Sequence, residues 1–302
     1  MKSVTLFGIS AAVATPFDIG GNIDFARLAT HSRRLLDEGC SSLTYFGTTG
    51  EGPSLSTAER RQTLKEMVSA GVPGDKINVA IIVPALGDAI AEALFGAEIG
   101  CNALLVAPPF YFKQPDDDGL FAWFSGLVTA LGAPCPKIIL YHIPQVTAAP
   151  LSINLVRRLK QCFPDQIYGV KDSSGDWENG RRLLEMKDMA IMLGDERLLG
   201  EASRLGGQGM ISGVANFDAA TLVRTLATGV SDQALNTLVD IIVSYPVIPA
   251  VKVALAHHLG DEAWIRVRAP LLSADGDATN AVVAGLNALQ AKKHPKMLER
   301  TE

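Results

Sequence analysis

A lysine directly follows a short apolar segment near the middle of the chain. Residues 167–170 read as a buried strand, Lys171 comes next, and a polar turn that contains Ser173 follows. A charge at this position is costly unless it is paired or reacts. Burial disfavours the ammonium form, so a desolvated lysine presents more neutral amine, which condenses with ketones to give a Schiff base. Lys171 is therefore a candidate nucleophile; the alternative is a lysine whose end simply reaches water.

A tyrosine ends the apolar segment that comes before this one. Tyr141 closes residues 137–141. Imine formation and aldol steps both need proton transfers, and a phenol near the amine can carry them. Taken alone, Tyr141 could equally be a core or rim tyrosine. His142 would face the other side of a continued strand, and we interpret it as structural.

Residues 47–51, Gly-Thr-Thr-Gly-Glu, follow another apolar segment. Backbone N–H groups and two hydroxyls in such a turn make a cradle for a small carboxylate. The turn lacks the Lys-Ser/Thr pair of a P-loop, so a nucleotide site is not indicated. The structural alternative is an ordinary connection to a helix that Ser56 caps, with Glu59 completing a capping box.

Polar residues and glycines end several other apolar segments. Asp195 and Glu196 could bind polar substrate groups, but carboxylates at a helix start usually act as caps. The residues that we expect to contact substrate are Thr48, Thr49, Gly50, Ser173, Gly194 and Ile211.

The elements that must position these residues alternate regularly. Short apolar segments, typical of strands buried on both faces, are separated by amphipathic segments. Expected strands are 9–14, 42–46, 78–82, 103–107, 137–141, 167–170, 190–193 and 209–212. Expected helices between and after them are 25–38, 57–70, 88–99, 119–131, 153–161, 177–187, 197–205 and 219–227. Eight such units predict a (β/α)8 TIM barrel over residues 1–230, with active-site residues at the carboxyl ends of the strands.

The pattern changes after the eighth unit. Residues 232–244, 248–259 and 279–291 read as helices without strands between them, so we assign residues 231–302 to a C-terminal helical extension packed on the barrel. The runner-up fold is an open doubly wound sheet, which the absence of GxGxxG after the first strand weakens.

Composition limits the class of function. The 302 residues are 48% hydrophobic and 20% charged, with a formal net charge of −5. No basic run suggests nucleic acid as a partner, and no apolar run is long enough to span a bilayer, so we expect a cytoplasmic protein. The cysteines, Cys40, Cys101, Cys135 and Cys162, have no metal-site spacing, and we expect buried free thiols and no metal.

The chain resembles the dihydrodipicolinate synthase / N-acetylneuraminate lyase family of class I pyruvate lyases. The resemblance rests on GTTGE at 47–51, YHIP at 141–144 and GVKDSSGD at 169–176, with LGD at 193–195 and GGQGMISGVAN at 206–216. It covers nearly the whole chain.

This resemblance implies roles for single residues. Lys171 would be the Schiff-base lysine and Tyr141 the catalytic tyrosine. Thr48 and Thr49 would bind the pyruvyl carboxylate, and Thr49 with Tyr111 would complete a proton relay. In many members the second tyrosine comes from a neighbouring subunit, so a homotetramer built as a dimer of dimers is expected. No cofactor or metal is implied, since the imine forms on Lys171 itself.

Departures from the family pattern affect the substrate. Val146 stands where the synthases place an arginine that holds the aldehyde's carboxylate, and an alkyl group cannot replace that clamp. Gly52 stands where they often have serine. We therefore expect reversible aldol cleavage of a 2-keto-3-deoxy sugar acid or a related hydroxylated 2-oxo acid. Alternatives are dihydrodipicolinate synthase, a Schiff-base dehydratase, or an inactive ligand-binding homologue.

Overall fold

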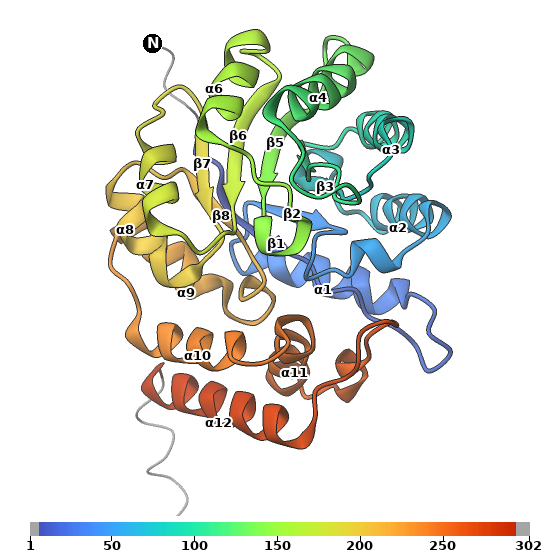
Figure 1. Cartoon of the computed structure of the whole chain (residues 1–302). Helices are drawn as coiled ribbons and strands as arrows, with labels where there is room; N and C mark the ends of the chain where they lie inside the picture. Colours follow the sequence, from blue (N-terminus) through green and yellow to red (C-terminus); the bar gives the residue numbers. More distant parts are fainter. Residues whose placement is uncertain (1–5, 294–302) are drawn as a thin grey trace, which may run out of the picture.

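The computed structural model describes residues 6–293 as a closed barrel with a layer of helices below it (Figure 1). Within these residues eight parallel strands pair in chain order, and β1 closes on β8, so the predicted TIM barrel is confirmed. The strands are β1 (Gly8–Ala12), β2 (Ser42–Tyr45), β3 (Ile77–Ile81), β4 (Ala103–Val106), β5 (Lys137–His142), β6 (Ile167–Asp172), β7 (Ala190–Leu193) and β8 (Gly209–Ser212).

Helices surround the strands as in Figure 1. They are α1 (Phe25–Asp37), α2 (Thr57–Ser69), α3 (Leu86–Glu98), α4 (Asp117–Leu131), α5 (Pro144–Thr147), α6 (Ile153–Cys162), α7 (Trp177–Leu184), α8 (Leu199–Arg204) and α9 (Ala215–Thr228). Short 3-10 turns cover Gly52–Ser54, Gly74–Lys76, Glu196–Leu198 and Glu262–Ile265. The predicted helix at 197–205 is thus shorter, because its first turn is the 3-10 turn that Asp195 caps.

Both faces of the barrel strands are buried, which explains the continuous apolar segments. Ile139, Tyr141, Met192 and Ile211 belong to a cluster inside the barrel. Their chain neighbours, such as Leu140 and Ile191, pack in the larger cluster between strands and helices. The alternation of strand side chains therefore fixes which residues can line the barrel mouth.

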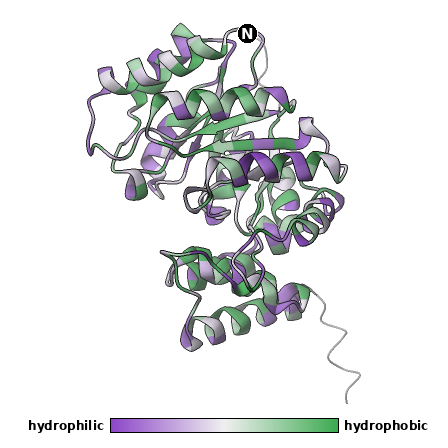
Figure 2. Ribbon diagram, turned by 90° about the vertical axis from the view of Figure 1, so that its right-hand side faces the viewer, coloured by the Kyte–Doolittle hydropathy of each residue, from purple (hydrophilic) through white to green (hydrophobic). Residues whose placement is uncertain are grey.

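The chain after α9 forms the helical extension, and the predicted division at residue 230 falls in the connection between α9 and α10. Its helices are α10 (Gln233–Val243), α11 (Val247–Leu259) and α12 (Gly276–Lys293). Figure 2 shows this group as a separate layer that contains both hydrophobic and hydrophilic residues and is joined to the barrel on one side. At the contact, the ring of Trp264 lies 4.7 Å from that of His31 in α1. Residues 1–5 and 294–302 of the two predicted units lie outside the described part.

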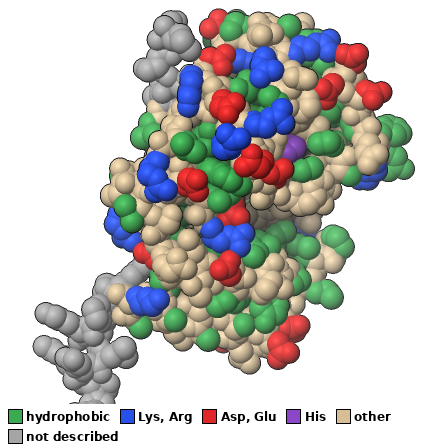
Figure 3. Space-filling view, turned by 60° about the vertical axis from the view of Figure 1, so that its left-hand side comes forward, with side chains coloured by type: hydrophobic (Ala, Val, Ile, Leu, Met, Phe, Trp, Pro, Cys, Tyr) green, Lys and Arg blue, Asp and Glu red, His purple; other side chains and the backbone are tan. Residues whose placement is uncertain are grey.

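Some smaller expectations can be compared with residues 6–293. Cys40 and Cys101 are buried free thiols, but Cys135 is half-buried and Cys162 is exposed at the end of α6, so that expectation was wrong for two cysteines. None of the helices in this part of the chain is long and apolar enough to cross a membrane. Figure 3 shows acidic and basic side chains interspersed on the face that it presents.

Candidate active site

Lys171 and Tyr141 lie side by side at the mouth of the barrel. They are register partners on the neighbouring strands β6 and β5, so both side chains emerge on the inner face. The Lys171 Nζ is 4.6 Å from the centre of the Tyr141 ring. Lys171 is only 7% exposed and Tyr141 only 2%. The structure thus brings the predicted amine and phenol together in a shielded position.

The Tyr141 hydroxyl lies 3.1 Å from the Thr48 Oγ1, within hydrogen-bonding distance. The relay expected from the sequence used Thr49, but in this chain the hydroxyl that contacts Tyr141 is that of Thr48. Thr49 is turned toward Gly213, which follows β8. A Cβ atom added to Gly213 would lie 3.2 Å from the Thr49 Oγ1. Adjacent residues of a turn point in different directions, and a Thr-Thr pair does not show from its sequence which one faces the tyrosine.

The loop of residues 47–52 is held by backbone contacts on several sides. Thr15 donates a hydrogen bond from Oγ1 to the Gly50 carbonyl at 2.6 Å. A Cβ on Gly50 would lie 2.6 Å from the Val13 carbonyl oxygen, and one on Gly52 only 1.8 Å from that of Phe46. These positions therefore require glycine for close backbone packing. Gly52 does not line the pocket, so the structure does not link this position to the substrate.

A buried ion pair anchors the same loop to the extension. Glu51 has a left-handed backbone, with φ of 55°, and its carboxylate meets the Lys252 ammonium of α11. The second oxygen of Glu51 accepts a hydrogen bond from the backbone N–H of Arg268 at 2.8 Å. Lys252 also donates to the Arg266 carbonyl at 2.6 Å. The loop that carries Thr48 and Thr49 is thereby fixed by residues far away in the sequence.

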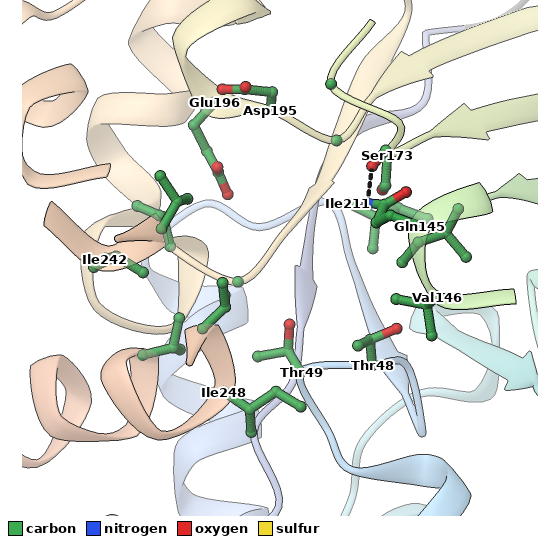
Figure 4. A pocket seen from close by; sticks show the side chains of 18 of the residues that line it. Thr48, Thr49, Gln145, Val146, Ser173, Asp195, Glu196, Ile211, Ile242 and Ile248 are labelled. Carbon is green, nitrogen blue, oxygen red and sulfur yellow. Dashed lines mark hydrogen bonds between the residues drawn. The ribbon is translucent and has the colours of Figure 1, made fainter. Parts of the chain in front are cut away.

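The residues just after Lys171 shape one side of the pocket. Asp172 is buried and points away from the lysine; it accepts hydrogen bonds from the Ser174 N–H at 2.9 Å and the Asn179 side chain at 2.8 Å. Gln145 of α5 donates from Nε2 to the Ser173 carbonyl at 2.6 Å (Figure 4). In the segment GVKDSSGD, the lysine faces the pocket and the aspartate holds the turn.

Glu196 faces the pocket, whereas its neighbour Asp195 performs a structural task. Asp195 accepts from the Arg197 N–H at 3.0 Å and pairs with the Arg197 side chain. The Glu196 carboxylate is directed into the cavity (Figure 4) and accepts a hydrogen bond from the Ser212 hydroxyl at 2.6 Å. Burial raises the pKa of Glu196, and the Ser212 hydrogen bond opposes that shift. Sequence reasoning left substrate binding open for both carboxylates but favoured capping, and it did not distinguish the two residues.

These residues line a cavity of about 500 Å³ that the extension closes on one side. Ile242 of α10 and Ile248 of α11 lie on that side, with Val146 across the cavity (Figure 4). Gly194 and Ile211 also line it, as do Ser173, Thr48 and Thr49. Within the described part of the chain, Lys171 is the only basic side chain among the lining residues. The sequence predicted helices with apolar faces in the extension, but nothing in it indicated that these helices would line the cavity.

Two residues that the sequence singled out lie elsewhere. Tyr111 follows β4 and is 73% exposed, with its ring edge-on to the exposed Phe112 at 5.3 Å, and it does not line this chain's cavity. His142 is buried on the outer face, where its Nδ1 accepts a hydrogen bond from the Leu151 N–H at 3.0 Å. Residues 6–293 contain no group of three or more side chains placed to hold a metal ion.

Comparison with known proteins places this architecture in one family. A profile of the dihydrodipicolinate synthetase family matches residues 5–289. The chain belongs to this family. Enzymes of the family are class I lyases that form a lysine Schiff base with pyruvate and need no metal, and this family member is a Schiff-base lyase.

Individual relatives cover nearly the whole chain. An uncharacterized DapA-like lyase from Chloroflexus aurantiacus is 35% identical over 300 residues, 95% of this chain and 98% of the relative. A 4-hydroxy-tetrahydrodipicolinate synthase from Agrobacterium fabrum is 31% identical over 287 residues, 91% and 95% of the two chains. The crystal structure of dihydrodipicolinate synthase from Agrobacterium tumefaciens superposes with a TM-score of 0.92 at 43% identity, covering 94% of this chain and 99% of that one.

Proposed function

We propose that this family member is an aldolase that forms an imine between Lys171 and the ketone of pyruvate or another 2-oxo acid. The observation that carries the proposal is the shielded pair of Lys171 and Tyr141, whose hydroxyl is within hydrogen-bonding distance of Thr48. A chloride-inhibited dihydrodipicolinate synthase from Acinetobacter baumannii, 26% identical with a TM-score of 0.84, was solved with pyruvate, which supports the ligand class.

The lysine supplies the nucleophile and the electron sink. Its neutral amine attacks the ketone carbon, and loss of water leaves a protonated imine. Tyr141 transfers protons to and from the reacting oxygen, and Thr48 orients its hydroxyl. No resident cofactor is required by this proposal, because the protonated imine itself stabilises the carbanion formed when the neighbouring C–C bond breaks.

The carboxylate of the 2-oxo acid would bind in the turn of residues 48–50. Thr48 and Thr49 line the cavity, and the Glu51–Lys252 ion pair keeps this turn in place. Glu196 lies where it can bind a hydroxyl of the distal part of the substrate. We therefore propose a hydroxylated 2-oxo acid, which is cleaved to pyruvate and an aldehyde.

The synthase reaction has less support at this site. Its aldehyde carries a second carboxylate, and within residues 6–293 no basic side chain other than Lys171 lines the cavity. Val146 lines the cavity (Figure 4), and it stands at the position where the family resemblance leads us to expect the arginine that holds that carboxylate. An unpaired carboxylate beside Glu196 would be repelled and poorly solvated.

We also propose that Tyr111 acts across a subunit boundary in a homotetramer. Its exposure beside Phe112 supports this, because two large aromatic rings rarely stay solvated unless a partner covers them. In that arrangement the Tyr111 of a second copy would extend the proton relay that begins with Tyr141 and Thr48.

Reductive trapping tests the proposed imine. The protein is incubated with pyruvate and borohydride, and its intact mass and peptide map are measured. We expect a reduced pyruvyl adduct on Lys171 that is absent from Lys171→Met, while Lys137→Met, at the opposite end of β5, keeps the adduct. Absence of any adduct from the parent protein would refute the proposal.

A further inference from the structure

The part of the cavity away from Lys171 has an apolar wall. The extension supplies Ile242, Val243, Val247, Ile248 and Leu271, and Val146 lies across from Ile242 (Figure 4). Val243 and Val247 are exposed to solvent although they line the cavity. When a ligand covers apolar side chains that are exposed to water at a cavity, the free energy of the complex is lowered.

The charges around the cavity exclude one kind of occupant. The acidic side chains that line it are Asp195, which is already paired with Arg197, and Glu196, which has no basic partner among the lining residues of the described chain. An anionic group in this part of the cavity would meet a carboxyl group and no counter-ion. A polyhydroxylated chain that reached the extension would meet the alkyl groups of Ile242, Val243, Val247 and Ile248, none of which offers a side-chain hydrogen-bond partner.

We propose that the aldehyde half of the substrate is uncharged and carries an apolar group that packs against Val243, Val247 and Ile248. The substrate class is then a 4-hydroxy-2-oxo acid with an alkyl or aryl substituent on C4. This inference rests on the proposed aldolase function and narrows it: among hydroxylated 2-oxo acids, the wall favours those with one hydroxyl and an apolar end over sugar acids.

The reaction balances without a further reagent. In cleavage, the imine on Lys171 withdraws the electron pair of the C3–C4 bond, and the C4 hydroxyl loses its proton toward Tyr141 as the aldehyde forms. The enamine takes a proton on C3, and water hydrolyses the imine to release pyruvate and the free amine. Condensation is the reverse: C3 of the enamine bonds to the aldehyde carbon, whose oxygen takes a proton and becomes the C4 hydroxyl.

The test is an acceptor series with pyruvate as the common partner. The aldehydes are acetaldehyde through hexanal, benzaldehyde, glyceraldehyde and aspartate semialdehyde, and kcat/KM is measured for each. We expect kcat/KM to rise roughly fourfold per added methylene until the wall is covered. Hexanal or benzaldehyde should exceed both glyceraldehyde and aspartate semialdehyde by at least about tenfold.

A double variant with near-isosteric replacements tests whether the apolar wall causes the preference for long aldehydes. Val243→Thr with Val247→Thr should lower kcat/KM for hexanal roughly tenfold and for acetaldehyde less than about twofold, because only the longer chain reaches the added hydroxyls. Val230→Thr, an exposed valine outside the cavity, is the matched control and should change neither.

The outcomes separate this inference from the proposal beneath it. Trapping with pyruvate alone needs no aldehyde, so an adduct on Lys171 together with a preference for glyceraldehyde or aspartate semialdehyde would overturn the inference and leave the aldolase standing. An equal effect of the valine variants on all aldehydes, or no turnover of any of them, would also overturn it. Failure to trap pyruvate would remove both.

Discussion

Lys252 in α11 and Glu51 in the loop after β2 form an ion pair in which both side chains are completely buried. The ammonium also lies 4.5 Å from the centre of the Phe17 ring. Burial lowers the pKa of Lys252, and the Glu51 carboxylate opposes the shift. The pair connects the C-terminal extension to the loop that carries Thr48 and Thr49. The extension therefore holds this loop in place in addition to lining one side of the cavity.

Removing the ammonium of this pair should destabilise the fold. We expect Lys252→Met to lose about 3–5 kcal/mol in the free energy of unfolding, because Glu51 is left as an uncompensated buried charge. Urea denaturation measures the loss, and Lys76→Met, at an exposed lysine, is the matched control. Equal stability of the two variants would show that the pair does not hold the loop.

Thr48 and Thr49 should differ in which kinetic constant they control. Thr48→Val removes the partner of the Tyr141 hydroxyl and should lower kcat by roughly 10²- to 10⁴-fold, the usual range for a proton-transfer group. Thr49→Val should chiefly raise KM for pyruvate. Steady-state kinetics with the preferred aldehyde separates the two. If Thr48 and Tyr141 act as a unit, as proposed, adding Tyr141→Phe to Thr48→Val should cost little more than either change alone.

An arginine at position 146 should create activity toward a carboxylated aldehyde. Val146 is 60% exposed on the cavity wall, so a longer side chain fits without disturbing the core. Val146→Arg should raise kcat/KM for aspartate semialdehyde roughly tenfold, since a charge-assisted hydrogen bond contributes about 1.5–3 kcal/mol. Val146→Met controls for size. A similar rise with Val146→Met would contradict the electrostatic explanation.

His31 should make the fold sensitive to acid. Its Nε2 is 3.0 Å from the Asn216 Oδ1, and Asn216 holds the ends of β1 and β8 by donating to the carbonyls of Ala12 and Gly213. Burial lowers the pKa of His31 to about 3, from 6.5 for an exposed histidine. As the pH falls, His31 is therefore protonated in the unfolded chain before it is protonated in the folded one. The contribution of neutral His31 to the free energy of unfolding is complete above pH 6.5 and is lost as the pH falls toward 3.

The expected loss from this residue is roughly 3 kcal/mol between pH 7 and pH 4. Unfolding free energies measured across this range should fall less steeply in His31→Gln, whose amide keeps a donor for Asn216. His257→Gln, at an exposed histidine in α11, is the control and should keep the slope of the parent. An unchanged slope in His31→Gln would show that other groups control the acid transition.

Subunit mixing tests the proposed role of Tyr111. Lys171→Met and Tyr111→Phe are expected to be nearly inactive separately. If Tyr111 serves a neighbouring copy, mixed oligomers combine an intact Lys171 with an intact Tyr111 at some interfaces, and activity should return to about a quarter of the parent level for paired subunits mixed at random. Size-exclusion chromatography confirms that subunits have exchanged. No recovery in exchanged oligomers would place both residues in the same chain's site.

Local sequence patterns were sufficient to predict the strands and helices of the barrel. The strands β6 and β5, which carry Lys171 and Tyr141 near their carboxyl ends, could be found from short apolar segments, because burial on both faces leaves a continuous hydrophobic signal. Ser56 and Glu59 form the expected capping box, since that motif is contained within four residues. Barrel closure then brings strand ends to one rim, so the lysine and the tyrosine were predictable neighbours.

The tertiary structure alone decided which side chains complete the site. The choice of Thr48 over Thr49, and the turn of Glu196 into the cavity, depend on backbone dihedrals such as the positive φ of Phe46, which composition and periodicity do not encode. The Glu51–Lys252 pair joins residues 201 positions apart. The apolar wall of Ile242 and Ile248 depends on how the extension docks. The sequence determined the elements and the position of the candidate nucleophile because these are local; the shape of the pocket came from long-range packing, which no local pattern specifies.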